Sequence, residues 1–314
     1  MSKEIQVLPY DPNWPHIYEK EAALIGQALS GNCLAIHHIG STSVPGLAAK
    51  PTVDMITVVG SGDLSIAQLE KVGFSYKGEW NIPFKFGFTK RGQDEINLHV
   101  FEEGHPEIEL NILFRDHLRS NPQSLKEYAH IKETLIEDET SFQKQKGNMF
   151  SGYNLGKDRF IRQILKTSGY NGHRFLKVTH IQEWEDYHRI RKTEIFDAIG
   201  VVYDAHHPSI TANSAYHFIV CHGIEVRTVA HIELLNESDA ALRSLATDSG
   251  FQRQGYGAEM MALLEKWLKR QNIKVLKMHS RLSAEPFYRK LGFLEMPFDD
   301  PSIQEQYIDL GKAL

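Results

Sequence analysis

The residues from Leu245 to Ala258 have types and spacing that suit the binding of an anion. An apolar strand pattern ends near Thr247, and the polar stretch that follows carries Gly255 and Gly257 before an amphipathic helix begins. Glycine lets the main chain approach a ligand closely, and the first amides of a helix have no intrahelical acceptor. These amides and the positive end of the helix dipole favour a bound phosphate group. The sequence therefore predicts a pyrophosphate cradle between Gln252 and Ala258.

A tight turn leading into a surface helix is the alternative interpretation of these glycines. The helix itself is strongly indicated, because apolar residues recur at three-to-four spacing along one face. They are Met260, Met261, Leu264, Trp267 and Leu268. Two other phosphate-binding loops are excluded by pattern. Met260 stands where Gly-x-Gly-x-x-Gly needs its third glycine, and no Gly-Lys-Ser/Thr sequence follows.

A second motif follows the cradle helix. The segment Ser283-Ala-Glu-Pro-Phe-Tyr-Arg-Lys-Leu-Gly-Phe293 reads as a short helix that carries Tyr288 and ends at a glycine. Together with Gln252-Arg-Gln-Gly-Tyr-Gly257 it resembles the GCN5-related N-acetyltransferase (GNAT) superfamily. The earlier segment matches the acetyl-CoA signature Arg/Gln-x-x-Gly-x-Gly/Ala, and the later one matches the element Ala-x-x-Phe-Tyr-x-x-x-Gly-Phe. The resemblance implies a mixed sheet flanked by helices and acetyl transfer from acetyl-CoA to an amine.

The same resemblance implies where acetyl-CoA lies. Its pyrophosphate is expected on the main chain of the cradle, and its pantetheine arm along the strand edge before it. The expected contacts are Leu245, Ala246, Thr247, Gln252, Arg253, Gln254, Gly255, Tyr256, Gly257, Ala258 and Ser283. Gln252 replaces the more frequent arginine, and Arg253 is expected to compensate for the lost charge.

Acetyl transfer needs a proton for the departing thiolate and a base for the amine. Tyr288 stands where the family has its tyrosine, so the resemblance assigns it as general acid, with simple aromatic packing as the alternative. His231 and Glu233 alternate on one side of a predicted strand, so either could take the amine proton directly or through water, or the pair could belong to a solvated strand face. No metal is required, and the adjacent histidines at 206 and 207 lack a spaced carboxylate or cysteine partner.

The first half carries a separate set of motifs that closely resembles the GrpB family, over residues 1 to about 167. GrpB domains look like members of the nucleotidyltransferase fold, a mixed sheet with helices in which a glycine-serine turn holds a triphosphate and paired carboxylates bind magnesium. The motifs are Val7-Leu-Pro-Tyr-Asp-Pro-Asn-Trp-Pro15, His38-Ile-Gly-Ser-Thr-Ser-Val-Pro-Gly-Leu-Ala-Ala-Lys-Pro-Thr-Val-Asp54, Asn97-Leu-His-Val100, Phe114-Arg-Asp-His-Leu-Arg119 and Tyr153-Asn-Leu-Gly-Lys157.

The metal pattern of that fold is incomplete here. Asp54-Met55-Ile56 lacks the second carboxylate that magnesium chemistry prefers, although Glu95, Asn97 and His99 share a face of a later strand and could complete a site. We therefore expect a degenerate nucleotide- or ligand-binding domain. Its expected site residues are Gly40, Ser41, Lys50, Asp54 and His99. A magnesium- and nucleotide-dependent nucleotidyltransferase and a purely structural loop are the alternatives.

The elements that position these motifs indicate two α+β domains. The 314-residue chain has turn formers clustered at residues 168–173, so we place domains at 1–170 and 171–314. In the second, helical pattern covers residues 181–199. Strands are expected at 216–222, 226–235, 240–247 and 275–279 and around Ile308.

The composition of the chain limits the classes of partner that it is expected to bind. A net charge of −5 gives no general attraction to nucleic acid or an acidic membrane. No apolar run approaches the roughly eighteen residues of a transmembrane helix, and no signal peptide is evident. We expect a cytoplasmic protein with free thiols at Cys33 and Cys221 and no indicated oligomeric state. The predicted activity is acetyl-CoA-dependent N-acetylation of a small-molecule or protein amine. An acyl-CoA sensor without activity is the non-enzymatic alternative.

Overall fold

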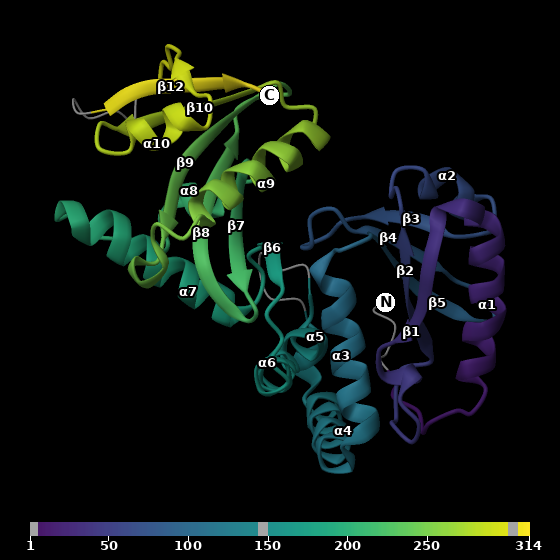
Figure 1. Ribbon diagram of the computed structural model, residues 1–314. Helices are drawn as coiled ribbons and strands as arrows, with labels where there is room; N and C mark the ends of the chain where they lie inside the picture. Colours follow the sequence, from purple (N-terminus) through teal and green to yellow (C-terminus); the bar gives the residue numbers. More distant parts are fainter. Residues whose placement is uncertain (1–5, 144–149, 301–306) are drawn as a thin grey trace. The chain divides into compact units, whose positions relative to one another are not determined.

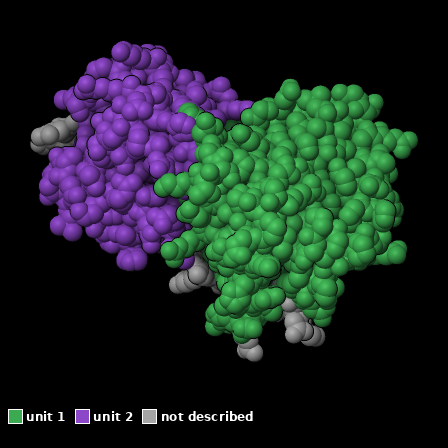
Figure 2. All heavy atoms as spheres, turned by 60° about the horizontal axis from the view of Figure 1, so that its bottom comes forward, with its two compact units in different colours: residues 1–173 green, residues 174–314 purple. Residues whose placement is uncertain are grey.

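The computed structural model describes residues 6–143, 150–300 and 307–314. The chain divides into two compact units, residues 1–173 and 174–314, which Figure 2 colours separately. Each unit is α+β, as the sequence predicts. Within the described ranges, no helix combines the length and the apolar character that crossing a bilayer requires.

The described part of the first unit is built on a five-stranded sheet in the order β1-β2-β5-β4-β3 (Figure 1). Strands β2 and β5 are parallel, and the other neighbours are antiparallel, so the sheet is mixed. The strands are β1 (Cys33–Ile39), β2 (Thr52–Val59), β3 (Ser75–Gly78), β4 (Phe86–Lys90) and β5 (Glu95–Glu102). The helices are α1 (Trp14–Leu29), α2 (Ser65–Glu70), α3 (Pro106–Ser120), α4 (Pro122–Glu137), α5 (Gly152–Leu155) and α6 (Asp158–Thr167).

Strand β2 is apolar on both faces because both faces are covered. Val53 and Met55 pack into the core beneath α1, whereas Ile56 and Val58 pack on the opposite side with Ile108 of α3. This alternation fixes the direction of the one acidic residue in the strand. The side chain of Asp54 shares the face of Ile56 and therefore points away from α1.

The described part of the second unit has a seven-stranded sheet in the order β11-β12-β10-β9-β8-β7-β6. Its strands are β6 (His173–Lys177), β7 (Ala215–His222), β8 (Glu225–Leu234), β9 (Asp239–Thr247), β10 (Val275–Arg281), β11 (Leu294–Glu295) and β12 (Tyr307–Ala313). Its α-helices are α7 (Ile181–Arg191), α8 (Pro208–Thr211), α9 (Tyr256–Arg270) and α10 (Glu285–Lys290). The predicted helical pattern after residue 181 is α7 followed by a π-helical turn, η4 (Lys192–Phe196), and a 3₁₀ turn, η5 (Asp197–Ile199).

Two helices cover opposite faces of this sheet. The apolar face of α9 is fully buried, and its Trp267 contacts the rings of Tyr216 and Phe218 on β7. Between those two residues His217 points the other way, where the hydroxyl of Tyr187 on α7 lies 2.7 Å from its Nδ1. Side chains of neighbouring strands in register with His217 therefore face α7.

Strands β9 and β10 separate part-way along their length. They are paired in parallel only from Asp239↔Val275 to Ala241↔Lys277, whereas β10 pairs with β12 throughout and β9 pairs with β8 to its end. The β8–β9 register shifts beside Arg243, so β9 carries a bulge there, and a bulge bends a strand and increases its twist. Within the described residues, the β9 edge from Leu242 to Thr247 therefore has no strand partner on its β10 side.

Candidate active site

The loop between β9 and α9 has the backbone that an anion cradle requires. Gly255 caps α9 with a φ of 94°, and Arg253 also lies in the left-handed region with a φ of 62°. The amide of Glu259 bonds the carbonyl of Gly255 at 3.0 Å, so the amides of Gly257 and Ala258 precede the first bond within the helix. A Cβ added to Gly255 would meet no heavy atom within 4 Å, so the loop is open at that point.

The side chains of the cradle glutamines fold back on the loop. Nε2 of Gln252 donates to the carbonyl of Thr247 and to Glu194, both at 3.1 Å, and Gln254 bonds the carbonyl of Gly250. Glu194 also accepts from the amide of Ser249 at 3.1 Å. Gln252 thus braces the loop with its side chain and has only its main chain to offer an anion.

Gly257 and Tyr256 hold the helix in place. A Cβ on Gly257 would lie 3.4 Å from the ring of Phe287 and 3.6 Å from Oγ1 of Thr247, so this glycine permits close packing between α9, β9 and α10. The buried hydroxyl of Tyr256 lies 3.0 Å from Nδ1 of His222. Both residues can contribute main chain to a ligand, while their own positions are set by the protein interior.

Tyr288 lies on α10 with its ring edge-on to Phe287 and Phe293, at centroid distances of 5.0 and 5.8 Å. The side chain is buried, and its hydroxyl makes no hydrogen bond to the described residues. Burial raises the pKa of Tyr288, and Arg281 offsets only part of that effect. The phenol is therefore a neutral proton donor. Ser283 is exposed in the turn before this helix.

The two proposed bases differ in their surroundings. His231 is buried opposite Ser244 of β9 and His217 of β7, and its Nε2 has no hydrogen-bond partner. Burial, with smaller effects from His217 and nearby arginines, lowers the pKa of His231 to about 2. The ring is thus neutral at working pH and poorly able to hold a proton.

Glu233 lies two residues further along β8 and is partly exposed. Its carboxylate accepts from Nε of Arg243 at 2.6 Å and from the hydroxyl of Ser214 at 3.3 Å. Arg243 also bonds Asp300. Glu233 is therefore anchored in an ion-pair network with the bulge residue Arg243.

Arg191 is a site residue that sequence reasoning missed. It ends α7, is only 5% exposed, and faces the same side of the sheet as His231. A cation in the last turn of a helix is ordinarily a surface residue that interacts with the helix dipole. No pattern in the sequence distinguished it from Arg189 two positions earlier, which is exposed and paired with Asp186 and Asp248.

In the first unit, the turn after β1 lies directly on Asp54. Gly40 has a φ of 68°, and a Cβ there would lie 2.6 Å from Oδ2 of Asp54. Arg115 donates to the carbonyl of His38 at 3.0 Å, and Arg119 donates to the carbonyl of Ser43 at 2.7 and 3.0 Å. The turn is thus fixed through its carbonyls by two arginines of α3.

Three lysines gather around this turn. Lys132 of α4 bonds the hydroxyl of Ser41 at 3.3 Å and the carbonyl of Ala48, while the ammonium groups of Lys50 and Lys157 lie 4.1 and 4.4 Å from the ring centre of Tyr153. Burial lowers the pKa of Lys50 and Lys157 to about 8 and that of Lys132 to about 7. Lys132 escaped the sequence analysis, and Lys157, the N-cap of α6, appeared there only as the end of a family motif and not as a site residue.

Asp54 is the carboxylate of this cluster. It accepts from Nδ2 of Asn97 at 2.9 Å, and its burial raises its pKa against the opposing effect of that bond and of Lys157, Arg91 and Lys50. Glu95, the other carboxylate on this face of β5, pairs in register with Thr52, two residues before Asp54 along β2.

His99 belongs to a different environment. It lies opposite Ile56 and near Trp80, and burial, with help from Lys85, lowers its pKa to about 3. The structure brings Gly40, Ser41, Lys50 and Asp54 together, whereas the described neighbours of His99 are other residues. Across the described ranges, no three His, Cys, Asp or Glu side chains are arranged to hold a metal ion.

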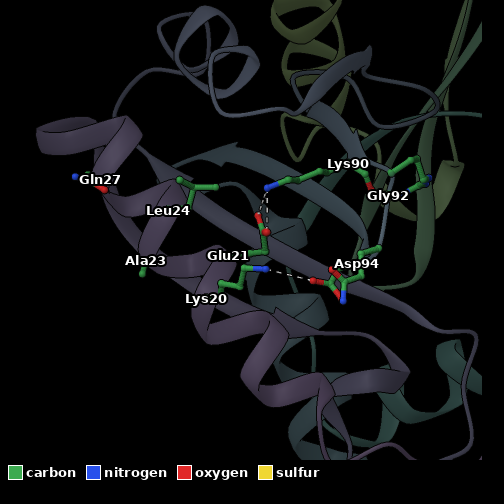
Figure 3. Close-up of a pocket in the computed structure, with 10 residues that line it drawn as sticks. Lys20, Glu21, Ala23, Leu24, Gln27, Lys90, Gly92 and Asp94 are labelled. Carbon is green, nitrogen blue, oxygen red and sulfur yellow. Dashed lines mark hydrogen bonds and ion pairs between the residues drawn. The ribbon is translucent and has the colours of Figure 1, made fainter.

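A further hollow of about 430 Å³ lies between α1 and the β4–β5 turn (Figure 3). Its charges are paired across the opening: Lys90 bonds Glu21 at 2.9 Å, and Lys20 lies 3.5 Å from Asp94. None of the residues singled out from the sequence lines it. Because its ions already satisfy one another, it offers a ligand little charge to bind.

Comparison with known proteins identifies both halves. The family described as GrpB protein matches residues 4–167, which is more than half of the chain. The chain belongs to the GrpB family. A second family, described as acetyltransferase (GNAT) domain, matches residues 191–310. Both predicted resemblances are therefore confirmed, and this GrpB protein carries a GNAT acetyltransferase domain after its GrpB domain. The likeness of its first domain to nucleotidyltransferases stays a prediction.

Individual proteins are similar to one half of the chain or the other. A UPF0157 protein of Halalkalibacterium halodurans is 41% identical over 165 residues, covering 52% of this chain and 81% of the relative. The crystal structure of conserved protein GrpB from Enterococcus faecalis is 32% identical, with a TM-score of 0.45, and covers 52% of this chain and 96% of that one. The ribosomal-protein-S18-alanine N-acetyltransferase from Escherichia coli is 17% identical, with a TM-score of 0.38, and covers 45% and 93%.

Proposed function

We propose that the second unit transfers the acetyl group of acetyl-CoA directly to an amine. The observation that carries this proposal is the separation of β9 from β10, which leaves a strand edge free immediately before the cradle. A pantetheine arm can pair with this edge as an added strand does, while the pyrophosphate meets the amides at the start of α9. The residue assigned as general acid, Tyr288, follows on α10.

Two different residues then carry out the two proton transfers of the reaction. The amine nitrogen attacks the thioester carbonyl, a carbon–nitrogen bond forms, and the carbon–sulfur bond breaks as the thiolate takes a proton from Tyr288. The amine loses its proton to Glu233, directly or through water. We favour Glu233 over His231 because the buried imidazole, with its pKa of about 2, hardly binds a proton at neutral pH. Main-chain amides along the free edge of β9 are available to polarise the carbonyl.

Two measurements on the full-length protein test this function. Acetyl-CoA should raise the melting temperature, since a ligand at 100 times its Kd stabilises by about 2.7 kcal/mol. Free thiol should then appear when amines are added. Stabilisation without thiol release from any amine would favour the acyl-CoA sensor, and the absence of both effects would exclude an acetyl-CoA site.

We also propose that the GrpB unit binds a phosphate-rich anion. Three ammonium groups surround the Gly40–Ser41 turn, whereas the carboxylates that act on them are Asp54 and, at Lys132, the exposed Glu133. This excess of buried positive charge suits an anion better than it suits a magnesium site, which needs more carboxylate ligands. It favours the ligand-binding interpretation over nucleotidyl transfer.

The probes for this anion site are inorganic tripolyphosphate and nucleoside triphosphates, each with and without magnesium. Tripolyphosphate alone should raise the melting temperature, and Lys157→Met should remove that shift. Lys166→Met is the matched control, because Lys166 is exposed on the same helix. A shift that requires both nucleotide and magnesium, and that Asp54→Asn abolishes, would instead support the transferase.

A further inference from the structure

Arg191 is a buried cation without a counter-ion. Its guanidinium carbon lies 5.3, 5.8 and 5.7 Å from the ring centres of Tyr187, Phe196 and Tyr203. Its Nε and Nη1 are buried and have no hydrogen-bond partner, and no carboxylate of the described residues forms an ion pair with it. The aromatic rings partly stabilise the charge, and the hydroxyls of Tyr187 and Tyr203 interact with the guanidinium, but these neutral groups supply no negative charge.

This arrangement lowers the stability of the protein when no ligand is bound. Arginine stays protonated at any working pH, and an uncompensated buried charge destabilises a fold far more than a paired one. The guanidinium presents its N–H groups as a planar fork that matches a carboxylate. A ligand carboxylate would supply both the missing acceptors and the missing negative charge.

Two other side chains on this side of the sheet, the buried His231 and the half-buried Ser244, also have unpaired buried polar atoms, Nε2 and Oγ. These residues are opposite each other on β8 and β9, and His231 is opposite His217 on β7, so all three face α7. Arg191 contributes to lowering the pKa of both His217 and His231, which places its charge near them. The polar cluster therefore extends from Arg191 to the unpaired part of β9.

The turn that follows Arg191 links this cluster to both sides of the gap between β9 and β10. Glu194 accepts from Ser249 and Gln252 at the cradle, and the carbonyl of Ile195 accepts from Arg281 of β10 at 3.1 Å. This segment is a π-helical turn, a conformation frequently found at functional sites. Arg191 is thus held by the segment that spans the proposed path of the acyl chain.

We propose that Arg191 binds a carboxylate of the acceptor, so that the amine acetylated by this protein is a small amino acid or a similar amine that bears a carboxylate. This inference rests on the proposed function. Arg191 acts electrostatically on His231 of β8, and neighbouring strands lie about 5 Å apart, so a small molecule can extend across β8 toward β9, where the thioester would lie. His231 and the half-buried Ser244 would contact it in between.

The proposal is tested by measuring acetyl-CoA-dependent thiol release with a panel of free amino acids. Each amino acid is compared with its own carboxamide. The carboxamides have the less basic, more readily neutral amine, so intrinsic reactivity favours them. We expect the wild-type protein nevertheless to use at least one free acid with a kcat/KM roughly tenfold or more above that of its amide, an advantage consistent with a charge-assisted hydrogen bond.

Arg191→Met should bring that ratio to one or below, because intrinsic reactivity then favours the amide, while acetyl-CoA binding stays intact because the cradle does not involve Arg191. It should also raise the melting temperature of the ligand-free protein, since an unpaired buried charge is removed. The matched control is Arg189→Met, which alters an exposed arginine of the same helix and should keep the preference for the acid.

The outcomes separate the two proposals. Failure of the wild-type protein to bind acetyl-CoA would refute the proposed function itself. Acetyl-CoA binding combined with equal use of acids and amides, with use of neither, or with a preference that survives in Arg191→Met would overturn the role of Arg191 alone. Lower stability of Arg191→Met with weakened acetyl-CoA binding would show that the residue supports the fold instead.

Discussion

Replacing Gly255 by glutamate should separate anion binding from folding. The glycine has a φ of 94°, where a residue with a Cβ costs roughly 1–2 kcal/mol, but nothing lies within 4 Å of the added carbon. The stability loss should therefore be that strain alone, a decrease of about 5 °C in melting temperature for a unit of this size. The carboxylate, in contrast, would point into the opening where the pyrophosphate is expected.

The expected loss of affinity follows from charge repulsion. Two like charges about 5 Å apart, at an effective dielectric constant of about 20, repel by about 3 kcal/mol, which is roughly 100-fold in Kd. Calorimetric titration with acetyl-CoA measures this directly. Gly255→Ala should keep most of the affinity, because it adds the strain without the charge.

Gly200→Glu provides the control, since Gly200 has a φ of 69° and an equally open Cβ direction but lies outside the cradle. It should show a similar decrease in stability and normal acetyl-CoA binding. If folded Gly255→Glu bound acetyl-CoA as tightly as the wild-type protein, the cofactor could not lie on these amides, and the assignment of the cradle would be wrong.

Three further predictions concern single groups. Tyr288→Phe should lower kcat by about 10²- to 10⁴-fold with little change in stability, because the hydroxyl has no described hydrogen bond to lose; an unchanged kcat would exclude it as the acid. Arg253→Gly should stabilise the protein by about 1 kcal/mol in denaturant unfolding, since a φ of 62° strains arginine; its acetyl-CoA affinity should fall if the side chain meets the phosphates. Burial lowers the pKa of Lys50, Lys132 and Lys157 to about 8, 7 and 8, below the unfolded value of 10.5. Between these pKa values the unfolded chain binds more protons than the folded chain. The GrpB unit should therefore gain stability as the pH rises from about 7 to 10. Tripolyphosphate binding should weaken over the same range, and stability and affinity that changed in the same direction would contradict the lysine cluster.

The local motifs of this chain could be predicted because each depends on neighbouring residues. The succession of strands from residue 216 onward and the buried face of α9 both follow from short patterns of apolar residues. The two α+β units and both family resemblances were predicted in the same way and are confirmed.

The long-range part of each site could not be predicted. His231 and Ser244 lie opposite each other only because β8 and β9 pair in a register that a bulge displaces, and a bulge is not encoded by any short pattern here. Lys132 lies 91 residues from Ser41, its partner, on a helix whose other lysine, Lys126, is exposed. The low pKa of His231 arises from burial between strands, so the sequence left it equivalent to Glu233.

The partial pairing of β9 with β10 has a consequence for the mechanics of the second unit. In the described ranges, strands β10, β12 and β11 form a sub-sheet that shares three residue pairs with the remaining four strands. Such a sub-sheet can open locally at a lower free energy than the whole unit unfolds. A molecule that bonded to both sides of the division would raise that opening energy, so amide exchange in β12, at the far side of β10, would report whether the gap is filled.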